Sequence, residues 1–186
     1  NIESETEFDR VLDLAQRAVR TVRIALRINP GIEAGGHDKI STGRKTDKFG
    51  IEADHAIALY QRASEHAYVE PVGLAMHIGS QLTDLTPYRE AYSRMAEFVG
   101  VLRADGFDIT HLDMGGGLGI TYGDEVAPTP EAYGTMVAET VGNLGCRLTF
   151  EPGRMISGNA GILVTRVIFV KEGLAKRFCI VDGAMN

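Results

Sequence analysis

The feature of this sequence that most constrains its fold is the alternation of short apolar segments with amphipathic segments. Buried strands are predicted by short apolar runs at residues 24–28, 73–78, 109–114 and 146–151. Between them, apolar residues recur at helical spacing over 8–22, 88–102 and 129–144, and more weakly over 52–67. Strands that alternate with helices pair in parallel, so the sequence predicts an α/β fold built on a parallel sheet.

Unusual residues follow the strands and help to choose the architecture. The stretches RINPG, MHIGSQ, LDMGGG and FEPGR each come at the carboxyl end of a predicted strand. A (β/α)8 barrel gathers its active site at that end from several strands, whereas a doubly wound sheet concentrates it at one switch point. We therefore predict a partial TIM-type (β/α)8 barrel over residues 1–155. It would be the C-terminal half of a barrel, because a complete one needs about 250 residues.

The last part of the chain has a different pattern. Residues 162–172 and 177–185 are rich in strand-forming residues, with no helical pattern between them. We expect residues 156–186 to begin a second, β-rich domain. The chain starts without an initiator methionine and ends within an apolar run, so we expect it to be a portion of a longer polypeptide.

Composition argues against several classes of partner and site. The formal net charge is −6 and no basic cluster occurs, so nucleic acid and anionic membranes are not expected partners. No apolar run approaches the roughly 18 residues that cross a bilayer. Cys146 and Cys179 are far apart and lack CxxC spacing, which argues against a disulfide framework or a zinc site and favours the cytoplasm.

Gly115, Gly116 and Gly117 follow the third predicted strand. Small residues there would let backbone N–H groups point at an anion, although a tight turn explains the run equally well. The run matches neither the GxGxxG fingerprint nor a P-loop, because Ile120 follows GGGLG and no Gly-Lys-Ser/Thr occurs. The glycines alone leave both interpretations open.

The EPGR stretch contains an acid and a base. Glu151 ends the fourth predicted strand, where an unpaired carboxylate is costly, so it needs a cationic partner. That partner is either Arg154 or a protonated nitrogen of a ligand. Arg154 in turn suits a phosphate or a carboxylate through its planar fork of donors. An internal Glu151–Arg154 ion pair is the structural alternative.

The HIGSQ stretch places a ring, a hydroxyl and an amide within one turn. His77 could act as a general base, a metal ligand or a flat surface for stacking. No second histidine or acid lies at ligand spacing, which disfavours a metal, and a lone histidine at a strand end is often structural. Taken with the glycines, the acid and the arginine, these groups suit a phosphorylated aromatic cofactor with a basic ring nitrogen.

Five stretches of the sequence resemble a known enzyme family. They are NPGIEAGGHDKISTGRKTDKFGI (29–51), MHIGSQLTDLTPYREA (76–91), LDMGGGLGITY (112–122), EPGR (151–154) and IVDGAMN (180–186). In this order they are similar to the diaminopimelate decarboxylases, members of the alanine-racemase-like, barrel-type class of enzymes that use pyridoxal 5′-phosphate (PLP). The resemblance implies decarboxylation of meso-2,6-diaminopimelate to L-lysine and CO2 by a homodimer with shared active sites.

The resemblance also implies roles for individual residues. His77 would lie against the face of the pyridine ring and Glu151 would hold the ring nitrogen protonated, which makes these two the expected catalytic residues. Arg154 would contact the substrate carboxylate. The cofactor phosphate would be bound by residues of all three loops, namely Ser80, Gly115, Gly116, Gly117, Glu151, Pro152, Gly153 and Arg154.

Parts of the family pattern are absent from this sequence. The family's Schiff-base lysine lies in a motif resembling Tyr-Ala-x-Lys-Ala-Asn, and that setting is found at none of Lys39, Lys45, Lys48, Lys171 and Lys176. A Cys-Glu-Ser-Gly-Glu stretch and a later tyrosine are also missing, so we expect this chain by itself not to decarboxylate an amino acid. A decarboxylase of ornithine, arginine or carboxynorspermidine, or a non-catalytic barrel homologue, stays open as an alternative.

Overall fold

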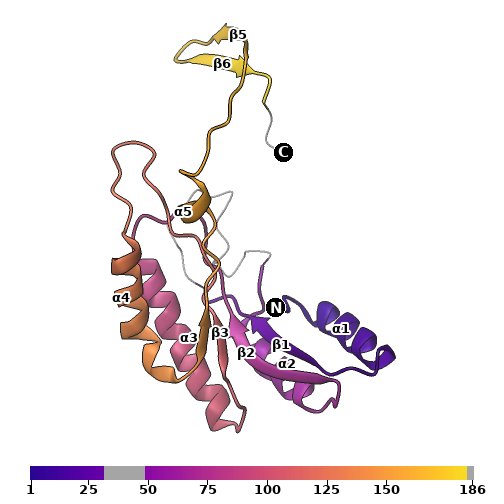
Figure 1. Cartoon of the computed structure of the whole chain (residues 1–186). Helices are drawn as coiled ribbons and strands as arrows, with labels where there is room; N and C mark the ends of the chain where they lie inside the picture. The colour runs from indigo at the N-terminus through magenta and orange to yellow at the C-terminus, as the bar shows by residue number, and fades with distance from the viewer. Residues whose placement is uncertain (32–48, 184–186) are drawn as a thin grey trace.

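The computed structural model describes residues 1–31 and 49–183. Its main body is a four-stranded sheet of β1 (Val22–Arg27), β2 (Val69–Ala75), β3 (His111–Asp113) and β4 (Arg147–Thr149). The strands are adjacent in chain order, and every neighbouring pair is parallel (Figure 1). Each strand overlaps one of the four predicted segments, so the predicted α/β fold with a parallel sheet is confirmed.

The strands alternate with helices α1 (Glu5–Arg17), α2 (Ala53–Ser64), α3 (Thr86–Ala104) and α4 (Pro130–Thr140), and the short helices η1 (Gly142–Leu144) and α5 (Arg154–Ser157) lie on either side of β4. The Ser4 hydroxyl starts α1 by accepting a hydrogen bond from Glu7 N–H (3.1 Å). The Thr129 hydroxyl starts α4 in the same way with Ala132 N–H (3.2 Å). These hydrogen bonds satisfy backbone donors that a helix start leaves open.

Helix α1 ends sooner than the sequence predicts. The apolar repeat predicts a helix through residue 22, but the helix stops at Arg17, and Val22 is the first residue of β1. Val19 takes a positive φ of 49°, which a helix does not allow, and its side chain is 75% exposed. The helical spacing of these two valines is therefore coincidental, because one lies in a turn and the other in a strand.

The sheet has two chemically different faces. Successive residues of a strand point to opposite faces. The register aligns Leu26, Leu74, Leu112 and Leu148 in one row across the strands, and Arg27, Ala75, Asp113 and Thr149 in the next. The first three leucines are fully buried in one hydrophobic core with residues of α1, α2, α3 and α4. We call the leucine side the helix-covered face and the side of Arg27, Asp113 and Thr149 the polar face.

A separate antiparallel pair follows the main body. Strands β5 (Val167–Glu172) and β6 (Arg177–Val181) form a two-stranded sheet that lies apart from the four-stranded sheet (Figure 1). The absence of a helix between these two strands matches the sequence pattern, although β5 begins at Val167 rather than at residue 162. The expected boundary between residues 155 and 156 falls within α5, and the division into two domains stays a prediction.

Two further features bear on ligands and membranes. Among the helices in the described ranges, none is both long and apolar enough to cross a bilayer. Within residues 1–31 and 49–183, no group of three His, Cys, Asp or Glu side chains is placed to hold a metal ion.

Candidate functional site

Three loops meet at the carboxyl ends of β2, β3 and β4, and they carry the HIGSQ, GGGLG and EPGR stretches. Glu151 N–H donates to Gly115 O (2.8 Å), which ties the EPGR loop to the glycine run. From the other side, Leu82 N–H donates to Gly117 O (3.0 Å), and Gly119 N–H donates to Leu82 O (2.9 Å). The structure therefore brings the three sequence motifs together at one end of the sheet.

The glycine run fits between its neighbours only because it has no side chains. A Cβ on Gly116 would lie 2.1 Å from Glu151 O, and a Cβ on Gly117 would lie 2.0 Å from Gly79 O. Gly115 and Gly117 also have positive φ values of 66° and 100°, which glycine adopts without strain. The run is therefore required by the close approach of three backbone segments, whatever ligand it meets.

Two of the three glycine amides are already hydrogen-bonded within the chain. Gly115 N–H donates to Asp113 Oδ1 (3.0 Å), and Gly116 N–H donates to His77 Nδ1 (3.2 Å). For Gly117 N–H the described ranges contain no acceptor, and this residue is half-buried where the other two are buried. The sequence treats the three amides alike as phosphate donors, whereas the structure distinguishes Gly117 from the other two.

The His77 ring is held in one orientation beside this turn. Its Nδ1 accepts the hydrogen bond from Gly116, so Nδ1 carries the lone pair and the proton of the neutral ring is on Nε2. Burial lowers the pKa of His77, and the positive charge of Arg27 lowers it further, against the opposing charges of Asp113 and Glu3. The ring is therefore neutral near pH 7.

The Glu151 carboxyl lies beside a second acid. Partial loss of hydration raises the pKa of Glu151, and the charge of Asp113 and a hydrogen bond with it raise that pKa further, while Arg27 acts in the opposite direction. Glu151 is exposed in this chain, where β4 is the last strand of the four-stranded sheet. The pair of acids favours a proton or a cation at this position.

Arg154 contacts polar groups rather than an acid. Its guanidinium donates to Ser80 Oγ and to Tyr122 Oη, both at 3.4 Å. Among the described residues no carboxylate lies within 4.0 Å of it, so the internal Glu151–Arg154 pair is not formed there. Pro152 and Gly153, which precede Arg154 in the same loop, are exposed.

Sequence reasoning missed two charged residues of this site. Asp113 accepts hydrogen bonds from Gly115 N–H and from Asn1 Nδ2 (2.9 Å), and Arg27 pairs with Glu3 at 2.6 Å. A signal for Asp113 exists, because an acid directly before a glycine run can accept from the amides that follow it. Arg27 has no such local signal, and only the strand register places it in the same row as Asp113.

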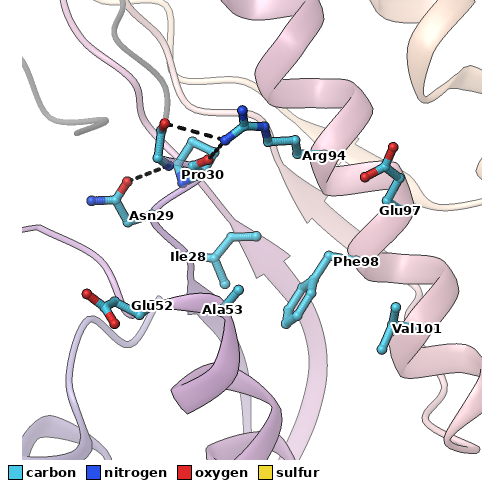
Figure 2. Close-up of a pocket in the computed structure, with 10 residues that line it drawn as sticks. Ile28, Asn29, Pro30, Glu52, Ala53, Arg94, Glu97, Phe98 and Val101 are labelled. Atoms are coloured by element: carbon cyan, nitrogen blue, oxygen red, sulfur yellow. Dashed lines mark hydrogen bonds between the residues drawn. The ribbon is translucent and has the colours of Figure 1, made fainter. Parts of the chain in front are cut away.

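A cavity of about 480 Å³ lies away from these loops, between the end of β1, the start of α2 and α3 (Figure 2). Its walls include Phe98 and Glu97 of α3 and Glu52 at the start of α2. At its rim Arg94 donates to Pro30 O (2.6 Å). None of the expected site residues lines this cavity, so it is separate from the candidate site.

The lysines of the chain fall into two groups. Lys171 is in β5 and Lys176 is in the turn before β6, so both belong to the separate two-stranded sheet. Lys39, Lys45 and Lys48 lie outside the described residues, as does most of the GHDKISTGRKTDKFG stretch.

Residues 1–158 match the family model of the pyridoxal-binding domain of pyridoxal-dependent decarboxylases. Over its whole length the chain is 46% identical to the diaminopimelate decarboxylase of Neisseria meningitidis serogroup A, of which it covers 46%. It is 44% identical to that of Pseudomonas aeruginosa, of which it covers 45%. The solved structure of Helicobacter pylori diaminopimelate decarboxylase complexed with L-lysine matches 98% of this chain and 46% of that one, at 38% identity and a TM-score of 0.89.

The chain belongs to the pyridoxal-dependent decarboxylase family, since the match to that family's model extends over residues 1–158. The resemblance to diaminopimelate decarboxylases that the motifs indicate is confirmed by the identities of 46% and 44%. Membership of this family implies PLP as the cofactor. The chain spans about half the length of the curated relatives it matches.

Proposed function

We propose that this chain forms the cofactor-binding wall of a PLP-dependent decarboxylase that converts meso-2,6-diaminopimelate to L-lysine and CO2. The observation that carries the proposal is the convergence of His77, Gly117 and Glu151 at the carboxyl ends of neighbouring parallel strands. The substrate is proposed from the relatives, which are diaminopimelate decarboxylases over the whole length of the chain. The relative from Helicobacter pylori was solved with L-lysine, the product of the proposed reaction.

We infer that the parallel sheet is the C-terminal half of a (β/α)8 barrel. The strands follow one another in chain order without a reversal, and the four long helices share one core on one face. A doubly wound sheet would reverse its strand order at a switch point and carry helices on both faces. In the proposed barrel the polar face is the interior, and the three loops form part of its carboxyl-terminal rim.

The acids of the polar face fit a cofactor with a basic ring nitrogen. Partial loss of hydration and the adjacent Asp113 raise the pKa of Glu151, and a protonated ring nitrogen beside Glu151 would offset the repulsion from Asp113 and favour the carboxylate. When bound, PLP supplies the electron sink for the pair of electrons left behind by the departing CO2. The task of Glu151 is to keep the proton on the ring nitrogen through its charge and a hydrogen bond.

The other site residues supply a surface and a set of anion ligands. His77 is neutral, and its bond from Gly116 presets the flat face of the imidazole for stacking on a pyridine ring. Arg154 and Ser80 are in contact at 3.4 Å, and with Gly117 N–H they provide a cation, a hydroxyl and an amide for the phosphate. Pro152 and Gly153 complete this loop, and Arg154 is also the proposed contact of the substrate carboxylate.

The proposed enzyme is a cytoplasmic homodimer with shared active sites that acts on a small amino acid. The homodimer is proposed from the family resemblance alone. The cytoplasm is proposed from cysteine usage, since Cys146 and Cys179 are free thiols. Ile168 and Phe169 of β5 are 59% and 55% exposed, which supports contact of this apolar hairpin with further polypeptide.

The Glu151→Ala variant tests the proposal. It is made in a full-length decarboxylase that contains this chain and is as long as the relatives. We expect kcat to fall by about 100-fold or more while thermal unfolding and circular dichroism stay close to those of the parent. The matched control is Glu70→Ala, because Glu70 is an exposed acid at the opposite end of the sheet, 3.7 Å from Arg23. A near-parental kcat in Glu151→Ala, or an equal loss in Glu70→Ala, contradicts the role of Glu151.

The substrate is tested separately by comparing kcat/KM for meso-diaminopimelate with kcat/KM for ornithine, arginine and carboxynorspermidine. We expect meso-diaminopimelate to give the highest value. A higher value for one of the other amino acids would leave the decarboxylase class in place and overturn the substrate.

A further inference from the structure

Three tyrosines lie behind the glycine run, on the side of the helices. Tyr88 and Tyr92 are on α3, one turn apart, and Tyr133 is on α4. Tyr88 and Tyr92 are fully buried, and the three ring centres lie 5.4 to 6.3 Å from one another. A buried tyrosine hydroxyl needs a hydrogen-bond partner. For Tyr88 and Tyr92 the partners are backbone carbonyls of the glycine-rich loop.

The hydroxyls hold two peptide groups of that loop. Tyr88 Oη donates to Gly116 O (3.1 Å), and Tyr92 Oη donates to Met114 O (3.0 Å). Tyr92 Oη also lies 2.5 Å from Tyr133 Oη, and because Tyr92 uses its one proton on Met114, Tyr133 is the donor of this pair. Burial raises the pKa of all three hydroxyls, so each keeps its proton near neutral pH.

A held carbonyl sets the direction of the next amide. In a trans peptide the C=O and N–H of one peptide group point in opposite directions, and the described residues include no cis peptide bond. Tyr88 holds Gly116 O toward the helices, so Gly117 N–H points away from them. Tyr92 does the same for the peptide before Gly115, whose N–H meets Asp113 Oδ1 on the polar face.

We propose that Tyr88 is a positioning residue for the phosphate of the cofactor, because its hydroxyl keeps Gly117 N–H turned toward that phosphate. This inference rests on the proposed function. Gly117 has a φ of 100°, in a region that glycine enters and leaves freely, so its own backbone preference does not fix the peptide plane. The hydroxyl of Tyr88 orders that plane before the anion arrives, which reduces the entropy lost on binding.

Tyr92 directs a different amide, which is not available to the phosphate. The amide that it directs, Gly115 N–H, is already bound to Asp113, so it offers no donor to a ligand. The two tyrosines share a helix, a depth of burial and a type of partner, but only Tyr88 directs an amide for which the described part of the chain provides no acceptor. They therefore form a matched pair for an experiment.

The test compares two ligands that differ only in the phosphate. The apo form of a full-length decarboxylase that carries this chain is titrated with PLP and with pyridoxal, which lacks the phosphate. In Tyr88→Phe, we expect the Kd for PLP to rise about 5- to 10-fold and the Kd for pyridoxal to stay within about twofold.

Two other tyrosines serve as controls in the same titration. Tyr92→Phe removes the equivalent hydroxyl from the same helix, and we expect it to change the ratio of the two Kd values by about twofold or less. Tyr60→Phe removes a buried hydroxyl that has no hydrogen-bond partner within the described ranges. We expect this variant to leave both Kd values unchanged.

A Tyr88→Phe enzyme with the parental ratio of Kd values overturns the inference. An equal loss of affinity for both ligands also overturns it, because a purely structural role would weaken both. A parent enzyme that binds PLP no more tightly than pyridoxal contradicts the proposed function itself. A parent that prefers PLP, together with a Tyr88→Phe variant in which that preference is undiminished, contradicts only the role of Tyr88.

Discussion

The two faces of the parallel sheet are stabilised by different forces. On the helix-covered face, Leu26, Leu74 and Leu112 form a fully buried row, and burial of each such side chain contributes about 1.5–3 kcal/mol. On the polar face, the next row contains Arg27, which makes a partly buried ion pair with Glu3, and Asp113, which accepts hydrogen bonds from Asn1 and Gly115. A partly buried ion pair contributes little net stability, because the loss of water around both charges offsets much of their attraction. One face therefore supplies stability, and the other is free to carry ionisable groups.

The glycine-rich loop links the two faces. Its carbonyls at Met114 and Gly116 accept hydrogen bonds from tyrosines of the helix layer, and its amides at Gly115 and Gly116 donate to Asp113 and His77. The peptide group between Met114 and Gly115 accepts from Tyr92 and donates to Asp113, so it connects the helix layer directly to the polar face. The comparison of the two faces therefore shows that packing on the helix-covered face helps to set the positions of hydrogen-bonding groups on the polar face.

The largest effect on stability is expected from a matched substitution on each face. Leu112→Ala should lower the free energy of unfolding by about 2–5 kcal/mol, because it leaves a cavity in the core. Thr149→Ala, on the exposed polar side of β4, should change it by no more than about 0.5 kcal/mol. Urea unfolding of both variants measures the difference. Equal losses would show that the polar face is packed as tightly as the leucine row.

A smaller effect is expected where the two faces meet. Gly116→Ala places a methyl group against Glu151 O and should destabilise the chain by about 1–3 kcal/mol. The control is Gly134→Ala in α4, where a Cβ would meet no atom within 4 Å. That change should stabilise the helix by about 0.5–1 kcal/mol. Thermal unfolding of both variants measures whether each substitution raises or lowers the stability. A Gly116→Ala variant as stable as the parent would mean that the loops can move apart.

The smallest effect is expected in the pH dependence of stability. The pKa of folded His77 lies below its unfolded value of 6.5, so the unfolded chain binds the proton more readily. Its contribution to stability is complete above about pH 6.5 and is lost as the pH falls toward the folded pKa. His77→Gln should therefore weaken the decline in unfolding free energy between about pH 7.5 and 5.5, measured by urea titration. Identical curves for the parent and His77→Gln would contradict this role of His77.

Much of the fold can be predicted from local sequence patterns. The strand and helix periods place all four parallel strands and the four long helices, and the error at Val19 and Val22 arises where a turn imitates helical spacing. The common location of HIGSQ, GGGLG and EPGR also follows from the sequence, because parallel strands bring their carboxyl ends to one edge. Closure of the barrel and the division at residue 155 stay predictions.

The details of the candidate site depend on contacts that no local pattern encodes. The sequence does not show which glycine amides already have an acceptor within the chain. The acceptors of Gly115 and Gly116 are side chains, and whether they reach these amides depends on loop geometry. It places Arg154 near Glu151 in the chain, yet the guanidinium turns to Ser80 in a loop 74 residues away. Arg27 lies in no recognisable motif. Only the pairing of β1 with β2, and of β2 with β3, places it in the same row of the sheet as Asp113.

The sequence by itself determined that the chain is an α/β protein with a parallel sheet, that its unusual residues gather at one end of that sheet, and which family it resembles. These properties follow from residue spacing and motif order, which are local. Only the tertiary structure decided why the glycines are required, which nitrogen of His77 carries the proton, and which of the three glycine amides has no acceptor among the described residues. These depend on hydrogen bonds between loops that are distant in the chain, and such bonds are set by strand register and helix packing.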